Sequence, residues 1–144
     1  SRKATLFTEM MTCNALLRTD DLERFLQADF QNSNPLVLQL GGACPQQMRD
    51  ATKKAAAFGY RNVNINCGCP SSKVSGEGSF GAALMRDPDL VAKLASAAGD
   101  ALGEPVSVKC RIGVDDSDSF DELAKFISTV HAGGGVNHFI VVKY

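Results

Sequence analysis

A polar segment around Cys69 holds the residues best suited to chemistry. It reads Asn64-Ile65-Asn66-Cys67-Gly68-Cys69-Pro70-Ser71-Ser72-Lys73-Val74 and leaves an apolar run that is typical of a β-strand. In parallel α/β folds the loops at the carboxyl ends of the strands converge and form the active site. An ordinary thiol, with a pKa of about 8.5, is protonated near neutral pH and can protonate a developing carbanion. We therefore predict that Cys69 is a proton donor, and the alternative is a buried, inert cysteine.

Cys67 and Cys69 form a C-x-C pair, which raises the alternative of a metal site. A zinc site needs four ligands, usually as two close pairs, and the sequence has no second Cys/His pair. We therefore predict no metal, and alternation along the strand favours Cys67 as a small core residue. The five cysteines are an odd number and most lie beside apolar segments, which argues against a disulfide framework.

Two further polar residues, Gln39 and Lys109, lie inside apolar strand-like runs. A buried amide needs hydrogen-bond partners, and a buried ammonium needs an anion or an electron-rich ligand. Both residues are therefore candidate ligand contacts. The alternatives are a core amide satisfied by the backbone for Gln39 and an internal ion pair with Glu9 for Lys109.

The run Gly76-Glu77-Gly78-Ser79-Phe80-Gly81 matches the dinucleotide-binding pattern G-x-G-x-x-G. That pattern requires its first glycine directly after a strand, whereas about ten residues, Pro70 among them, intervene here. We predict a mobile active-site loop instead.

Strands and helices must alternate to place these residues. Strand-like runs are predicted at Ala4–Met10, Leu36–Leu40, Asn62–Ile65, Val106–Cys110 and His138–Val142. Amphipathic helices are predicted at about Asp20–Gln31 and Gln46–Phe58, from Asp87-Pro88 to Leu102, and from the capping box Ser119/Glu122 to a stop at Gly133-Gly134-Gly135. This alternation indicates an α/β fold of parallel strands, either a doubly wound sheet or a (β/α)8 barrel, in one continuous piece.

Composition narrows the class of protein. The chain has 144 residues, 44% of them hydrophobic and 22% charged, which is typical of a globular domain. No apolar run approaches the roughly 20 residues of a membrane helix, so we expect a soluble, intracellular protein. The net charge of −1 gives no general basic field, so any affinity for nucleic acid must be local or supplied elsewhere.

Five motifs together resemble the tRNA-dihydrouridine synthase family, most nearly its DusA-type branch. In the family's order and spacing they are Leu6-Phe7-Thr8-Glu9-Met10, Leu38-Gln39-Leu40-Gly41-Gly42, Asn64-Ile65-Asn66-Cys67-Gly68-Cys69-Pro70-Ser71, Phe80-Gly81-Ala82-Ala83-Leu84-Met85 and Val108-Lys109-Cys110-Arg111-Ile112-Gly113. The resemblance implies an FMN-containing TIM (β/α)8 barrel, here of about five βα units, with a smaller helical domain.

The resemblance also implies the reaction. Uridine in the tRNA D-loop would be reduced at its C5–C6 bond, with NADPH as electron source, FMN giving hydride to C6 and Cys69 protonating C5. By the same resemblance Gln39, Asn66, Lys109 and Arg111 match cofactor contacts, with the substrate as the alternative for Arg111, and Asn66 also lies beside the uracil. Lys73 and Arg86, near the catalytic segment, are candidate phosphate contacts, with a plain solvated surface as the alternative. The expected location is the cytoplasm, with an organelle as the alternative.

The chain departs from the family pattern at both ends. No flavin-contacting first strand precedes Ser1, and Val142-Lys143-Tyr144 stands where the family has His-Ala-Arg. We therefore expect residues 1–144 to be a partial catalytic barrel that lacks its first strand, its last strands and the helical domain, and to be inactive alone. The alternatives are a flavoprotein that resembles dihydroorotate or dihydropyrimidine dehydrogenase, and a catalytically dead fragment.

Overall fold

A computed structural model describes residues 4–26, 35–69, 81–112 and 119–143 of the chain. Its strands are β1 Leu6–Phe7, β2 Met11–Thr12, β3 Leu36–Gly41, β4 Val63–Asn66, β5 Ser107–Arg111 and β6 His138–Val142. Its helices are α1 Cys13–Arg18, α2 Leu22–Phe25, α3 Pro45–Phe58, the 3-10 helix η1 Gly81–Arg86, α4 Pro88–Leu102 and α5 Phe120–Gly134. Strands and helices alternate through most of the chain, as predicted.

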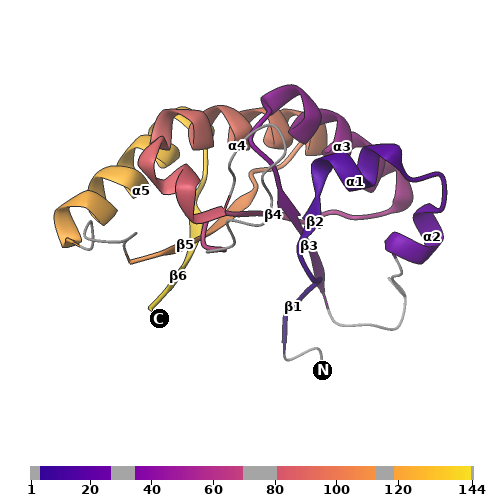
Figure 1. Ribbon diagram of the computed structural model, residues 1–144, viewed down its shortest axis with the longest axis horizontal. Coiled ribbons are helices and arrows are strands. Elements are labelled where there is room, and N and C mark those ends of the chain that lie inside the picture. The colour runs from indigo at the N-terminus through magenta and orange to yellow at the C-terminus, as the bar shows by residue number, and fades with distance from the viewer. Residues whose placement is uncertain (1–3, 27–34, 70–80, 113–118, 144) are drawn as a thin grey trace.

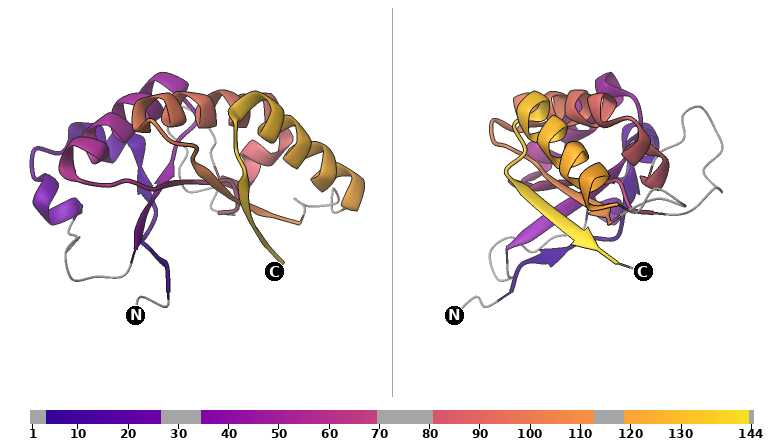
Figure 2. Two further views of the ribbon diagram at one scale, coloured as in Figure 1. Left: turned by 180° about the vertical axis from the view of Figure 1, so that it is seen from behind. Right: turned by 90° about the vertical axis from the view of Figure 1, so that its left-hand side faces the viewer.

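All strand pairs are parallel, and the sheet order is β1-β3-β4-β5-β6. The strands β1 and β2 pair with opposite ends of β3, so together they occupy one strand position. Helices α1, α3, α4 and α5 lie in an arc along one side of the sheet, and within the described ranges the other side carries no helix (Figures 1 and 2). This arrangement is a half-barrel of about five strands, which confirms the α/β class and the incomplete TIM barrel.

The alternation of side chains along each strand separates two faces. On the face toward the helices, Leu38, Leu40, Ile65, Val108 and Cys110 are fully buried and belong to one core cluster with residues of α3 and α4. The residues between them project to the opposite face, which we call the concave face. Every polar strand residue that the sequence singles out lies on this concave face.

The first predicted strand, Ala4–Met10, is wrong as a single element. It is interrupted between β1 and β2 because the Thr8 hydroxyl, and not a backbone carbonyl, accepts the N–H of Gln39 at 3.0 Å. Helix α1 follows at once, capped by the Thr12 side chain, which accepts from the N–H of Ala15 at 3.1 Å. This helix has no counterpart among the helices predicted from the sequence.

Three predicted helices are found, and a fourth differs. Helices α3, α4 and α5 match their predicted ranges, and the caps at Asp87 and at Ser119 with Glu122 form as expected. The predicted helix Asp20–Gln31 is present only as α2, and its last predicted residues lie outside the described ranges. None of the helices in the described part of the chain has the length and apolar character that a bilayer crossing requires.

The predicted stop at the glycine run near the end of α5 is found only at its last residue. Gly133 and Gly134 are still helical, and Gly135 ends the helix with a left-handed φ of 67°. A Cβ on Gly134 would lie 2.9 Å from the Cβ of Ala95 and 3.0 Å from the carbonyl oxygen of Ala92. These two helical glycines therefore allow α5 to pack closely on α4.

Replacing Gly134 by alanine should destabilise the fold by about 1–3 kcal/mol, because the helices α4 and α5 must then separate. Gly99→Ala is the matched control, since Gly99 is also helical and its Cβ would meet only the carbonyl oxygen of Glu104, at 3.5 Å. That variant should gain about 0.5–1 kcal/mol from reduced freedom of the unfolded chain. Urea unfolding of both variants measures the difference, and equal effects would contradict the close packing at Gly134.

Candidate active site

Asn66, the last residue of β4, organises the turn that carries Cys69. Its side-chain oxygen accepts hydrogen bonds from the backbone N–H groups of Gly68, at 3.0 Å, and of Cys69, at 2.9 Å. Its side-chain nitrogen donates to the Gln39 side-chain oxygen at 2.9 Å. The structure therefore brings three predicted site residues together at the carboxyl ends of β3 and β4.

The hydrogen bonds continue from Gln39 across the sheet. The Gln39 side-chain nitrogen donates to the Asn64 side-chain oxygen, and the Asn64 side-chain nitrogen donates to the Ser107 hydroxyl, both at 2.9 Å. The Ser107 hydroxyl in turn reaches the Val63 carbonyl at 3.4 Å. Asn64 is fully buried, and both its side-chain oxygen and its side-chain nitrogen have protein partners.

Cys69 is also held from the side of η1. Its carbonyl accepts the N–H of Ala82 at 2.9 Å, which joins the two ends of the intervening segment. Gly81 has a φ of 78°, and a Cβ there would lie 2.5 Å from the Cys69 carbonyl oxygen. Only glycine therefore allows this approach. The segment 70–80, with Lys73 and the predicted mobile loop, lies outside the described residues.

The two basic strand residues have different surroundings. Lys109 is half-buried and is paired in register with Asn66, and within the described ranges neither Glu9 nor any other residue gives its ammonium an ion pair or hydrogen bond. The Arg111 side chain donates from Nε to the Gly68 carbonyl at 2.6 Å, which binds β5 to the Cys69 turn. Arg86 is exposed at the end of η1.

Burial divides the five cysteines into two groups. Cys13, Cys67 and Cys110 are buried in the core, and Cys67 is 0% exposed, as strand alternation predicted. Burial raises the pKa of Cys67 strongly, that of Cys13 to about 12 and that of Cys110 to about 11. Cys44 is exposed and Cys69 is partly exposed. No cluster of metal-ligating side chains occurs among the described residues.

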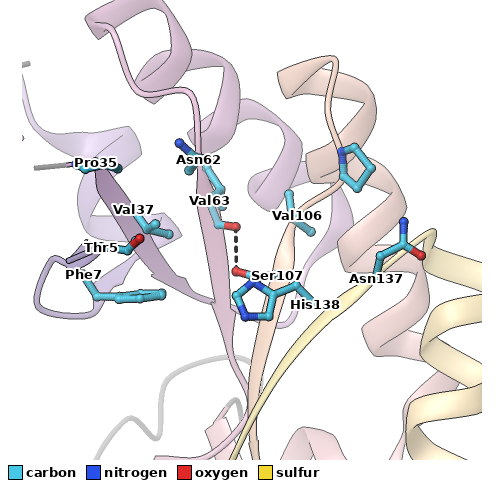
Figure 3. Close-up of a pocket in the computed structure, with 11 residues that line it drawn as sticks. Thr5, Phe7, Pro35, Val37, Asn62, Val63, Val106, Ser107, Asn137 and His138 are labelled. Atoms are coloured by element: carbon cyan, nitrogen blue, oxygen red, sulfur yellow. Dashed lines mark hydrogen bonds between the residues drawn. The ribbon is translucent and has the colours of Figure 1, made fainter. Parts of the chain in front are cut away.

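A cavity of about 410 Å³ lies at the amino ends of the strands, opposite to the Cys69 turn (Figure 3). Its lining includes Phe7 and Val37, together with Ser107 and His138 at the amino ends of β5 and β6. The Cys69 turn is not part of it. In parallel α/β barrels the amino ends of the strands serve stability, and the chemistry lies at the carboxyl ends. The Cys69 turn is therefore the better candidate site.

Three residues that contribute to this site were not among the candidates predicted from the sequence. Asn64 and Ser107 continue the hydrogen bonds of Gln39, and Gly81 permits the approach to Cys69. The available signal was polar alternation, Asn64-x-Asn66 and Ser107-x-Lys109, which puts four polar side chains on one face of two adjacent strands.

The donors at this site fit an acceptor-rich planar ring. An amide nitrogen carries two hydrogens, and the described hydrogen bonds use one at Gln39 and one at Asn66. The remaining N–H groups and the Lys109 ammonium belong to the concave face near the carboxyl ends of three adjacent strands. Ring carbonyls and ring nitrogens, such as those of an isoalloxazine, are suitable acceptors for this set.

Comparison with known proteins gives a consistent result. The family model described as "Dihydrouridine synthase (Dus)" matches residues 1–142. Proteins named "tRNA-dihydrouridine(20/20a) synthase" are similar to the chain: that of Pseudomonas syringae pv. tomato is 47% identical over 93% of this chain and 39% of its own length. That of Vibrio vulnificus is 41% identical over 98% of this chain and 42% of its own length. The chain thus spans about two fifths of these curated relatives.

Thiol labelling tests whether Cys69 is available or inert. With a thiolate-specific reagent near neutral pH, Cys44 and Cys69 should react, while Cys13, Cys67 and Cys110 should react roughly a hundredfold or more slowly because burial blocks access and raises their pKa values. Mass spectrometry of partly labelled protein gives the rate at each site. Protection of Cys69 equal to that of Cys67 would identify Cys69 as a core residue.

Proposed function

Because the chain belongs to the dihydrouridine synthase family, we propose that it forms part of the catalytic barrel of a tRNA-dihydrouridine synthase. The reaction is reduction of the C5–C6 double bond of uridine in the tRNA D-loop. The observation that carries the proposal is the Cys69 turn, where Asn66 holds the N–H of Cys69 at 2.9 Å at the carboxyl end of β4. The family match and the names of the relatives support the same reaction.

The proposed cofactor is FMN. When bound, it would supply the hydride that is added to C6, with NADPH as the source of electrons. In this proposal Gln39, Asn66 and Lys109 bind the ring through the donors of the concave face. Arg111 supports the site by holding the Gly68 carbonyl, at 2.6 Å, so that the Cys69 turn stays close to β5.

The proposed role of Cys69 is to protonate C5 of the uracil. A thiol can do this when it is protonated and lies near the carbon that becomes basic. The two hydrogen bonds on the backbone of Cys69, from Asn66 and from Ala82, keep its Cα in a defined place. After the transfer the thiolate regains a proton from water, so the residue is unchanged at the end of the cycle.

The substrate in this proposal is tRNA, and the target base must leave its stack to reach the concave face. Lys73 and the exposed Arg86 are proposed to contact phosphates beside the flipped nucleotide. A tRNA-modifying enzyme works where tRNA is present, so the cytoplasm or an organelle is the proposed location.

To act as the proposed enzyme, a half-barrel needs more binding surface for cofactor and tRNA than this chain provides. The chain spans about two fifths of its relatives, and we propose that further barrel strands and a helical domain complete the enzyme. In barrels of this type the cofactor phosphate is commonly bound after the seventh and eighth strands. The isolated chain should therefore hold FMN weakly and be inactive on tRNA.

A flavoprotein acting on a free pyrimidine is the other enzyme that the Cys69 segment allows. The names of the relatives specify tRNA, and they do not favour this alternative. Product formation from unmodified tRNA, compared with that from free uracil and orotate, separates the two.

Replacing Cys69 by alanine tests the proton donor. A suitable protein is a chimera in which this chain replaces the matching segment of the Pseudomonas syringae relative. Cys69→Ala should retain FMN and NADPH oxidation but lose about 10²–10⁴-fold in the rate of dihydrouridine formation, because only the step on uridine needs the acid. Cys44→Ala, at an exposed thiol, is the control. Product formation in Cys69→Ala at the control rate would exclude the role, and an inactive parent chimera would count against the proposed function.

Replacing Lys109 by methionine tests the cofactor contact. The change removes a cation from the concave face while keeping a flexible apolar side chain, so the affinity of the chimera for FMN should fall about tenfold or more. Flavin fluorescence titration measures the dissociation constant. Lys93→Met, at an exposed position on α4, should leave it unchanged. Equal constants for the two variants would make Lys109 a structural residue only.

A further inference from the structure

We propose that Asn64 and Ser107 are positioning residues that hold the Gln39 amide in the one orientation that matches the Asn66 turn. Together the four side chains form a continuous relay of hydrogen bonds across β3, β4 and β5. Its use in the reaction rests on the proposed function, but the existence of the relay does not.

The direction of the relay is determined because both of its ends are backbone groups. At one end, Asn66 faces two backbone N–H groups, those of Gly68 and Cys69, which can only donate. Its oxygen must therefore point to them, and its nitrogen must point to Gln39. At the other end, the Val63 carbonyl can only accept, so the Ser107 hydroxyl donates to it.

Each amide between these ends can then adopt one orientation. Gln39 receives the Asn66 N–H on its oxygen at 2.9 Å, so its nitrogen turns to Asn64. Asn64 accepts there with its oxygen, and its nitrogen donates to the oxygen of Ser107 at 2.9 Å. Reversing any one amide would put two donors or two acceptors in contact, and burial would leave no water to compensate.

The fixed direction decides what the site offers to a ligand. The Asn66 oxygen already accepts two hydrogen bonds, and its nitrogen donates one N–H to Gln39, so Asn66 has only one N–H to offer. Gln39 likewise keeps one N–H, since the other is taken by Asn64. The relay thus makes these positions hydrogen-bond donors, which selects a ring that presents carbonyl oxygens or unprotonated nitrogens. Asn64 and Ser107 act only through this selection, and so they are positioning residues.

Burial makes the relay stiff. Asn64 is 0% exposed, Gln39 7% and Asn66 8%, so loss of one member leaves its neighbour with a buried, unpaired polar group. Ser107, by contrast, lines the cavity at the amino ends of the strands (Figure 3). The relay therefore connects that end of the half-barrel with the Cys69 turn at the other.

Hydrogen exchange of the 144-residue chain, followed by NMR, tests the relay without any assumption about function. In Asn64→Leu, exchange of the Gln39 side-chain N–H groups should rise about tenfold, that of Asn66 severalfold, and that of the Cys69 backbone N–H by a smaller factor. The expected signature is an increase in exchange rate that becomes smaller with distance from Asn64 along the relay. Ser107→Ala should give a weaker form of it, and Ser107→Thr, which keeps the hydroxyl, should restore the parent rates.

Ile65→Val is the matched control, because Ile65 lies on the same strand but faces the helices. It lowers stability without touching the relay, so its effect on these exchange rates should not be graded. Identical exchange in Ser107→Ala and the parent chain, or the same pattern in Ile65→Val, would overturn the proposal. Ser107→Ala keeps the test decisive if Asn64→Leu does not fold.

The chimera adds a functional measurement. Ser107→Ala should lower kcat for dihydrouridine formation severalfold and leave KM for tRNA within about twofold, because the relay orients ring contacts and does not touch the body of the RNA. An inactive parent chimera would refute the proposed function, and the exchange data would still show whether the relay exists. Normal kcat with graded exchange would show a relay that the reaction does not use, and would overturn the positioning role.

Discussion

At the end of β4 the side-chain oxygen of Asn66 accepts hydrogen bonds from two backbone N–H groups, and the geometry of the site depends on these two bonds. It turns the chain out of the sheet at once, so Cys69 stands at the rim and not in the core. It also forces the Asn66 nitrogen toward Gln39, from which the orientation of every other amide in the relay follows. One backbone turn thus sets both the place of the thiol and the polarity of its surroundings.

The half-barrel holds the relay in place because the two faces of each strand have different partners. Ile65 and Val108 pack against the helices and are fully buried, while their neighbours Asn64 and Ser107 pair on the concave face. Buried amides are costly unless satisfied, so each amide on this sheet needs hydrogen-bond partners, and here the neighbouring strands supply them. The relay is the result, and it binds three strands together through side chains as well as through the backbone.

The same alternation separates the cysteines by chemistry. Cys67 and Cys110 project toward the helices, where burial raises their pKa values and removes them from solvent. Cys69, two residues beyond Cys67, has left the strand and is partly exposed. The C-x-C pair therefore consists of one core residue and one residue of the candidate site. Their spacing alone does not show this difference, which arises because the strand ends between them.

The sequence by itself determined the α/β class, four of the strands, the helices α3, α4 and α5, and the position of Cys69 after a strand, because these features follow from local periodicity and capping. It did not predict the break at Thr8 or the close helix contact at Gly134, since each depends on a partner far along the chain. For the same reason Asn64 and Ser107 looked ordinary. Only the parallel register, which aligns Gln39 with Asn64 and Asn64 with Ser107, decided that they form one directed relay.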